Sequence, residues 1–237
     1  MPITETHFCS VIDLPPHIDT NPTETQTRGF VVNAKRWTQG EEIPIAFLDG
    51  DQALRDRVEA VAREWLQYAQ LTFQIVEAAP QGIRISFATG PGSWSYIGTD
   101  CRDPSVVDPA AATMNYGWLT PASLDDELRR VVLHEFGHAL GMIHEHQNPL
   151  DHAIRWNEMA VLHDLSGPPN NWSDATIRSN IFAKYDKALG TGTDFDPASI
   201  MLYPVPASWT ENGYFSAGLN SELSDMDKLL IKQIYSR

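Results

Sequence analysis

Hydrophobic residues in the first half of the chain change between strand-like and helix-like spacing. Residues 43–48 form a short apolar run that ends at an Asp-Gly turn, which predicts a strand. Across residues 51–70 the apolar positions recur every three or four residues, which is typical of one long amphipathic helix. Residues 72–77 and 83–87 follow as shorter strand candidates, the second with apolar side chains at alternate positions. This order of elements predicts an α+β fold.

Two helices in the second half of the chain are predicted together with their caps. Ser123 is followed three residues later by Asp126, a capping-box pattern that predicts a helix from there to about residue 140. Gly141 comes directly after and is expected to end that helix. A last helix is predicted to begin at Ser224, with Asp227 in its cap.

The pattern between these elements is weaker. Residues 90–98 are rich in glycine and lead into a polar loop, while residues 112–119 are predicted as a further strand. Gly117 weakens that strand, which favours a place near the edge of the sheet. Residues 145–200 are expected to be mostly irregular.

The chain divides into a short arm and one domain. Residues 1–28 are rich in Thr, Pro, Asp and Glu, and their prolines block regular structure, so they are expected to form an extended arm or a short pro-segment. Residues 29–237 show one uniform composition, and a chain of 237 residues with 42% hydrophobic residues suits a single core. A basic start followed by an apolar stretch is missing, so no signal peptide is visible in this sequence.

Charge and cysteine content exclude several classes of protein. A formal net charge of −14 argues against nucleic acid and anionic membranes as partners, because both require clustered Lys and Arg. Two cysteines are too few for a disulfide scaffold. We therefore expect a soluble acidic protein that acts as a monomer.

The motif that carries chemistry lies at the end of the helix predicted before Gly141. His134 and His138 are four residues apart, which puts both imidazoles on one helix face where they can reach one metal ion. Gly141 allows the chain to turn sharply, so that His144 can return as a third ligand. Three histidines leave one coordination position open, as in catalytic zinc sites. Glu135 sits beside the first ligand, where its carboxylate can act as the base toward a zinc-bound water.

This motif resembles the zinc motif of the metzincins, and Glu145 directly after the third histidine is similar to the astacin form. Three further stretches resemble astacins: residues 92–98 before the zinc helix, residues 199–203 with Met201 as the Met-turn, and the closing helix at 223–235. Leu202 departs from the family, which usually has His there. The resemblance covers residues 29–237 and is weakest between 147 and 190.

The resemblance implies a zincin catalytic domain with a twisted, mostly parallel sheet, an edge strand that lines the cleft, an active-site helix, a Met-turn and a C-terminal helix. Its implied activity is that of a zinc endopeptidase with one catalytic Zn²⁺ and a peptide or protein substrate. Met201 would form an apolar floor below the metal, and the Tyr203 phenol would stabilise the oxyanion. The family also favours secretion.

A peptide substrate is expected to add to an exposed strand, which binds its main chain without reading its sequence. We assign this edge to the segment formed by Met114, Asn115, Tyr116, Gly117 and Trp118.

Two devices could keep such a protease latent. Alignment with astacins puts Gly29 at the start of a mature chain, so Arg28-Gly29 would be a trypsin-like activation point whose new amine approaches Glu145. Alternatively Cys9 in the arm could ligate the zinc. A Cys9–Cys101 disulfide and an unpaired thiol remain the rival states of Cys9, and the usual four-cysteine framework of the family is absent.

Four other interpretations concern neighbouring residues and the function itself. His146 is expected to be a surface histidine, and calcium binding by the loop acids is considered but not favoured over a solvated loop; these acids are Asp100, Asp103 and Asp108. A zinc-dependent module that binds peptides without cutting them is the alternative function. A branch closer to matrixins is disfavoured by Glu145 and Tyr203.

Overall fold

The computed structural model describes residues 6–12, 30–105, 107–149, 154–192 and 194–236. Its strands, in chain order, are β1 (Ser10–Ile12), β2 (Phe30–Val32), β3 (Glu42–Phe47), β4 (Thr72–Ile75), β5 (Ile83–Ser86), β6 (Ser93–Tyr96), β7 (Met114–Tyr116) and β8 (Gly190–Gly192). Its α-helices are α1 (Gln52–Ala62), α2 (Asp125–Ala139), α3 (Glu158–Ser166), α4 (Asp174–Ile177) and α5 (Asp225–Ile234).

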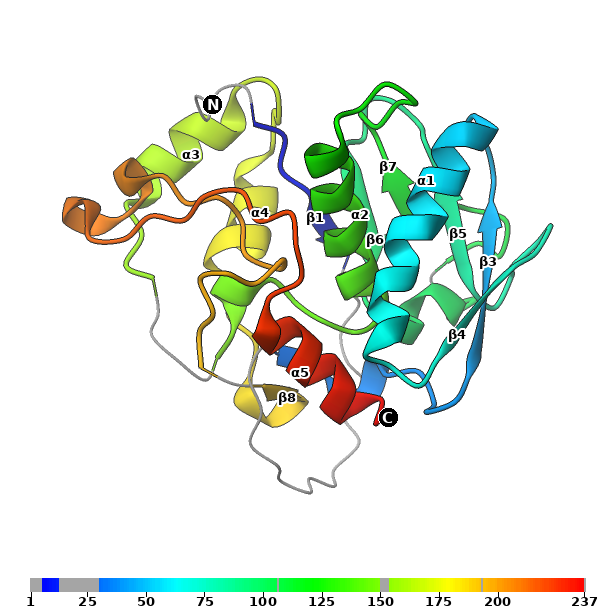
Figure 1. Cartoon of the computed structure of the whole chain (residues 1–237). Helices are drawn as coiled ribbons and strands as arrows, with labels where there is room; N and C mark the ends of the chain where they lie inside the picture. Colours follow the sequence, from blue (N-terminus) through cyan, green and yellow to red (C-terminus); the bar gives the residue numbers. More distant parts are fainter. Residues whose placement is uncertain (1–5, 13–29, 106, 150–153, 193, 237) are drawn as a thin grey trace.

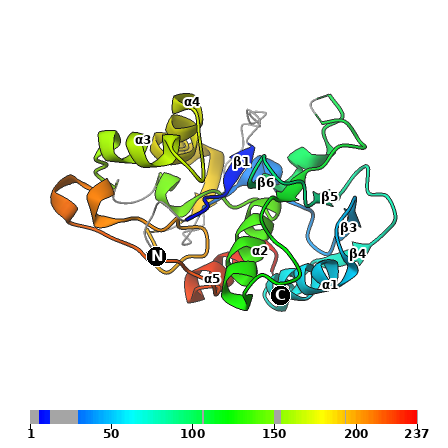
Figure 2. The ribbon, with the colours of Figure 1, turned by 90° about the horizontal axis from the view of Figure 1, so that it is seen from above.

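One six-stranded sheet organises the molecule, with the strand order β1-β6-β7-β5-β3-β4. Strands β3, β4, β5 and β7 pair in parallel, whereas β6 runs antiparallel to β7. Strands β2 and β8 form a separate antiparallel pair. Helices α1 and α2 lie side by side over one face of the sheet (Figure 1). Helices α3 and α4 lie beyond the edge strand β1, on the side away from the other strands of the sheet (Figure 2). The predicted α+β fold with a mostly parallel sheet is confirmed.

The helix predicted at 51–70 is a composite of two helical types. Asp51 caps α1 by accepting a hydrogen bond from the Ala53 amide at 2.8 Å. After Ala62 the chain continues as a 3₁₀ helix, Arg63–Gln67, which tightens the last turns. This helix holds the fully buried Trp65, whose indole N–H donates to the Leu133 carbonyl of α2 at 3.1 Å. The 3₁₀ segment thereby fastens α1 to the helix that carries the histidines.

Helix α2 begins without the predicted capping box, so that prediction is wrong. The Ser123 hydroxyl accepts a hydrogen bond from the Thr120 amide at 2.9 Å within the preceding turn, and Leu124 takes the N-cap position with no side-chain cap. Acidic residues in the first turn, Asp125–Glu127 among them, instead face the positive end of the helix dipole.

The strand predicted at 112–119 is present as β7, but its placement at the sheet edge is wrong. Strand β6 lies between β7 and β1, so β6 is the strand that faces the arm. Gly117 marks a close approach of two backbones, because a Cβ atom there would lie 2.5 Å from the Gly92 carbonyl oxygen. The glycines around β6 hid that strand within an apparent loop.

Helix α5 begins as predicted, with the Ser224 and Asp227 capping box in place. Asp227 is also fully buried and accepts hydrogen bonds from the Ser199 hydroxyl at 2.7 Å and the Ile200 amide at 2.8 Å. The closing helix therefore fixes the loop that precedes Met201.

No helix among the described residues has the length and apolar character needed to cross a membrane.

Candidate metal centre and active site

Three imidazoles converge at the end of α2, as the motif predicts. His134 and His138 lie one turn apart on the buried face of the helix. Gly141 adopts a φ of +96°, a conformation that glycine reaches without strain, and the chain turns so that His144 points back toward them. The Nε2 atom of His138 lies 3.2 Å from the Nε2 atoms of both His134 and His144.

The second nitrogen of each ring donates a hydrogen bond that fixes its tautomer. His134 Nδ1 donates to the Ile200 carbonyl at 2.9 Å, and His138 Nδ1 donates to the Met142 carbonyl at 2.8 Å. His144 Nδ1 donates to the side-chain oxygen of Gln147 at 3.0 Å. All three Nε2 lone pairs are therefore left to face one another.

This arrangement fits a zinc ion. Zn–N bonds of about 2.0–2.1 Å at tetrahedral angles place ligand nitrogens about 3.3 Å apart, close to the observed separation. Burial lowers the pKa values of His134 and His144 well below the usual range, which keeps these rings neutral and able to bind a metal. Three buried acceptors that converge without a donor between them require a cation, and His134, His138 and His144 would hold it.

Met201 packs against Gly137 of the metal-binding helix. It is fully buried, and a Cβ atom on Gly137 would come within 2.3 Å of its sulfur. Glycine at 137 therefore leaves the space that Met201 fills. The Met201 carbonyl also accepts a hydrogen bond from the Glu145 amide at 3.0 Å, which joins the Met-turn to the segment of the third histidine.

Glu135 is fully buried beside the first ligand. Among the described residues neither of its carboxylate oxygens has a hydrogen-bond partner. Burial raises the pKa of Glu135 to about 8, although the Cys9 thiol and the Arg130 charge act in the opposite direction. An unpaired buried carboxyl of this kind is costly to folding and is expected at sites of chemistry.

Tyr203 lies over the same group of rings. Its ring centroid is 4.3 Å from that of His144 and 5.7 Å from that of His134. Its hydroxyl donates a hydrogen bond to the Cys9 carbonyl, and burial raises the pKa of the phenol well above its usual range. Tyr203 thus contacts a peptide carbonyl next to the metal-binding histidines.

The arm occupies the front of this site. Strand β1 pairs in parallel with β6, and Cys9 directly precedes it. The Cys9 sulfur, a His134 ring nitrogen and a Glu135 oxygen lie within 4.8 Å of one another. Cys9 and Cys101 are both buried and both free, so the disulfide alternative is not what the structure shows.

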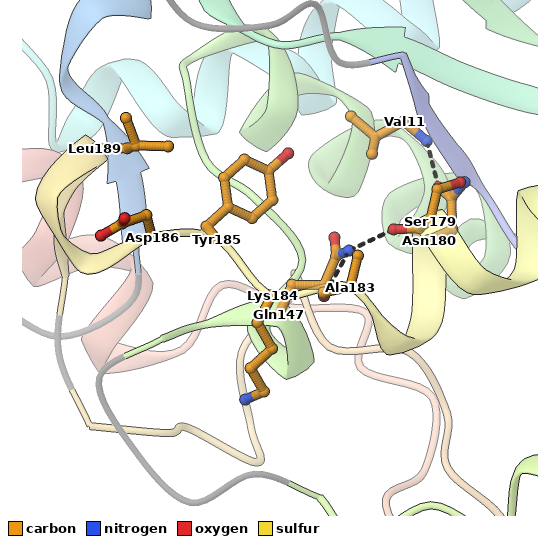
Figure 3. Close-up of a pocket in the computed structure, with 9 residues that line it drawn as sticks. All are labelled: Val11, Gln147, Ser179, Asn180, Ala183, Lys184, Tyr185, Asp186 and Leu189. Atoms are coloured by element: carbon orange, nitrogen blue, oxygen red, sulfur yellow. Dashed lines mark hydrogen bonds between the residues drawn. The ribbon is translucent and has the colours of Figure 1, made fainter. Parts of the chain in front are cut away.

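A cavity lies at each end of the described arm. One, of about 450 Å³, borders His7 and Phe8, the Gly90–Gly92 turn and the loop that contains Asn170. The other, of about 380 Å³, lies below Val11 and is walled by Tyr185 and Leu189 (Figure 3). The described arm therefore borders two cavities, one at His7 and Phe8 and one at Val11.

Glu145 and His146 directly follow the third histidine, and both are buried. His146 is buried, not on the surface: its ring stacks on His144 at 5.2 Å and its Nε2 atom lies 2.8 Å from the Asn180 carbonyl oxygen. It turns inward because the 3₁₀ helix Glu145–Gln147 directs all three of its side chains into the protein. Burial raises the pKa of Glu145 well above its usual range.

The loop acids considered for calcium do not gather into a metal-binding group within the described ranges. Asp100 pairs with Lys35 at 2.6 Å. Asp103 and Asp108 accept hydrogen bonds from nearby groups of their own turns, at 2.9 Å from the Ser105 amide and 2.8 Å from the Ala110 amide.

Several supporting residues could not be found from the sequence. Gln147 orients His144, and its amide nitrogen is itself held by the Ser179 and Ala183 carbonyls at 2.7 and 3.1 Å. Asn170 and Asn180 bind the backbone of the arm. All of these contacts except that between Gln147 and His144 join distant parts of the chain, and isolated amide residues give no periodic signal.

Comparison with known proteins supports the same family. No protein-family model and no curated protein matches the chain. A structure of myroilysin shares 41% identity at a TM-score of 0.82, covering 88% of this chain and 99% of that chain. A second myroilysin crystal structure shares 34% identity at a TM-score of 0.68, covering 100% of this chain and 94% of that chain.

The fold also matches high choriolytic enzyme 1, a hatching enzyme zinc-protease from the medaka fish Oryzias latipes. The identity is 18% and the TM-score 0.56, over 85% of this chain and 94% of that chain. This match shows the fold alone. The identity with myroilysin over almost its whole length exceeds what a shared fold requires, and the chain therefore belongs to the astacin-like metzincin family of zinc metalloendopeptidases.

Proposed function

We propose that this site cleaves internal peptide bonds with Glu135 as general base and Tyr203 as oxyanion donor. The observation that supports this most strongly is the unpaired, buried Glu135 carboxylate beside three converging histidine nitrogens. Zinc, when bound, supplies a Lewis acid that acidifies water and polarises the peptide carbonyl.

The residues of the chain divide the proton transfers between them. Glu135 takes a proton from the water that attacks the carbonyl carbon, and an O–C bond forms. The carboxyl then delivers this proton to the amine as the C–N bond breaks. The Tyr203 hydroxyl, which already donates to a peptide carbonyl in the arm, donates to the carbonyl oxygen as negative charge develops on it.

Casein hydrolysis with and without a chelator tests this function. We expect the full chain carrying Cys9→Ser to cut casein, to stop when a chelator removes zinc, and to resume when zinc is restored. The alternative, a module that grips peptides without cutting them, predicts zinc-dependent binding of casein with no new fragments at any zinc concentration.

We further propose that residues 6–12 hold the enzyme latent. The Cys9 thiol lies against His134 and Glu135, and the Cys9 carbonyl occupies the Tyr203 hydroxyl. A thiolate is a good zinc ligand, so Cys9 can take the coordination position that a substrate needs. The pairing of β1 with β6 covers the sheet edge at the same time.

Cys9→Ser is therefore expected to raise the casein-cleaving rate of the otherwise intact chain by about tenfold or more, since a hydroxyl is a far weaker zinc ligand than a thiolate. Cys101→Ser is the matched control, because Cys101 is equally buried but outside the site. Equal rates for the wild type and Cys9→Ser would remove the cysteine from the latency mechanism.

Removal of the arm after Arg28 is the second part of this proposal. Arg28 and Gly29 lie outside the described residues, but the Phe30 carbonyl accepts a hydrogen bond from the Ile143 amide at 3.1 Å, two residues before Glu145. A new amine at Gly29 would thus begin close to a buried carboxyl. Amino-terminal sequencing that finds Met1 or Pro2 in fully active enzyme would contradict the cut.

The proposed substrates are proteins and peptides bound by a monomer. The net charge of −14 supports the expectation that nucleic acids and anionic membranes are not partners.

A further inference from the structure

We infer that the aromatic pocket around Phe8 is the side-chain specificity pocket of the enzyme, and that it selects a large apolar residue, above all an aromatic one, immediately after the bond that is cut. We define the aromatic pocket by three residues: Trp172, Tyr203 and Trp209. This inference rests on the proposed peptidase function and adds a substrate preference to it.

The pocket surrounds Phe8 with ring faces and edges. The Phe8 ring stacks on Trp209 at 5.3 Å with an interplanar angle of 27°, and meets Tyr203 edge-on at 5.4 Å and 85°. Trp172 adds a third ring at 6.4 Å. Only 3% of Phe8 is exposed. Such contacts stabilise an aromatic guest beyond the burial of its surface.

The polar groups of Trp209 and Tyr203 in the pocket are already engaged. The Trp209 indole N–H donates to the Asp164 carboxylate at 2.8 Å, and the Tyr203 hydroxyl donates to the Cys9 carbonyl. A charged side chain in the position of Phe8 would lose its water without gaining a partner from these two rings. The pocket therefore discriminates against acidic and basic residues as well as against small ones.

The arm lies in this pocket as an extended peptide would. The side chain of Asn170 binds its backbone twice: the amide oxygen accepts from the Phe8 N–H at 2.9 Å, and the amide nitrogen donates to the Thr6 carbonyl at 3.0 Å. Asn180 accepts from the Val11 N–H at 3.0 Å on the same route. These contacts read only the main chain, so any extended peptide can use them, and the pocket alone reads the side chain.

The direction of the arm decides which residue of a substrate enters the pocket. Phe8 comes one residue before Cys9, and β1 runs parallel to β6. Antiparallel pairing is the more stable arrangement, so a productive substrate is expected to run antiparallel to β6. Such a substrate runs in the direction opposite to that of the arm. The residue that enters the pocket is then the one on the carboxyl-terminal side of the scissile bond.

Matched peptides test the preference in the full chain carrying Cys9→Ser. Internally quenched peptides that differ only in Phe, Ala or Asp at one central position are cut, and the fragments are identified by mass spectrometry. We expect kcat/KM for the Phe peptide to exceed that for the Ala and Asp peptides by about tenfold or more. The cut should fall on the amino side of Phe. Chelator-sensitive casein hydrolysis with equal rates on the three peptides, or a cut on the carboxyl side of Phe, would overturn the inference and leave the proposed function standing.

Variants of the pocket provide a readout that does not depend on absolute activity. Trp172→Ala is expected to reduce the Phe-to-Ala ratio of kcat/KM by about fivefold or more, because general destabilisation lowers both rates together. Tyr68→Ala is the matched control, since Tyr68 is a partly buried aromatic residue beside Lys228 of α5 and does not line the cavity that borders Phe8 and Trp172. An unchanged ratio in Trp172→Ala, or an equal fall in Tyr68→Ala, would contradict the assignment.

Discussion

Replacing Glu135 by glutamine is expected to leave zinc bound and to lower peptide hydrolysis by a factor of about 10² to 10⁴. Glutamine keeps the shape of the side chain but cannot accept the proton of the attacking water. The zinc ligands are untouched, because the Glu135 oxygens belong to none of the hydrogen bonds that orient the histidines. The measurements are kcat/KM on a quenched peptide and zinc per chain by atomic absorption, both in the Cys9→Ser background.

His138→Ala is the variant with which Glu135→Gln is compared. The His138 ring lies between the other two ligands, 3.2 Å from each nitrogen, so its loss should remove both zinc and activity. Glu59→Gln on α1, where the carboxylate pairs with Arg63 outside the site, should change neither quantity. If Glu135→Gln cut peptides at the wild-type rate, another group would have to be the base.

Tyr203→Phe is expected to lower kcat by about 10² to 10³ with little change in KM. The phenol is proposed to donate to the carbonyl oxygen only as charge develops there, so its loss affects the transition state more than binding of the substrate. The ring itself remains, and with it one wall of the aromatic pocket. Steady-state kinetics on the Phe-containing peptide separate kcat from KM.

Tyr116→Phe is a matched control for this variant. Tyr116 is also fully buried, and burial likewise raises its pKa well above the usual range, but its hydroxyl has no hydrogen-bond partner within the part of the chain that the structure describes. We expect its kcat to remain within a factor of about three, since it has no proposed role in oxyanion binding. An unchanged kcat for Tyr203→Phe would remove Tyr203 from the mechanism.

The metal site was predictable from the sequence because its geometry is local. His134 and His138 share a helix face by spacing alone, and Gly141 supplies the turn that returns His144. The Ser224 cap was predictable for the same reason, since its partner Asp227 is three residues away. Short-range rules were sufficient for these pairs, but they failed at Ser123, which matched a capping box although its hydroxyl accepts a hydrogen bond from the Thr120 amide in the turn before the helix.

The walls of the site were not predictable because they depend on distant partners. The position of β6 between β7 and the arm strand β1 depends on pairing with segments that lie far from it in the sequence. His146 resembled a surface residue in sequence, but the 3₁₀ helix that carries it packs against Asn180, 34 residues away.

The hydrogen bonds of Asp227 determine when the metal site can form during synthesis of the chain. Asp227 fixes the Ile200 amide, and the Ile200 carbonyl holds the first zinc ligand, so the metal site depends on a helix near the end of the chain. A ribosome makes residue 227 almost a hundred residues after His134. A nascent chain therefore contains all three histidines well before Asp227, which fixes the Ile200 segment, has been made. Proteolytic activity is expected only after translation has passed α5.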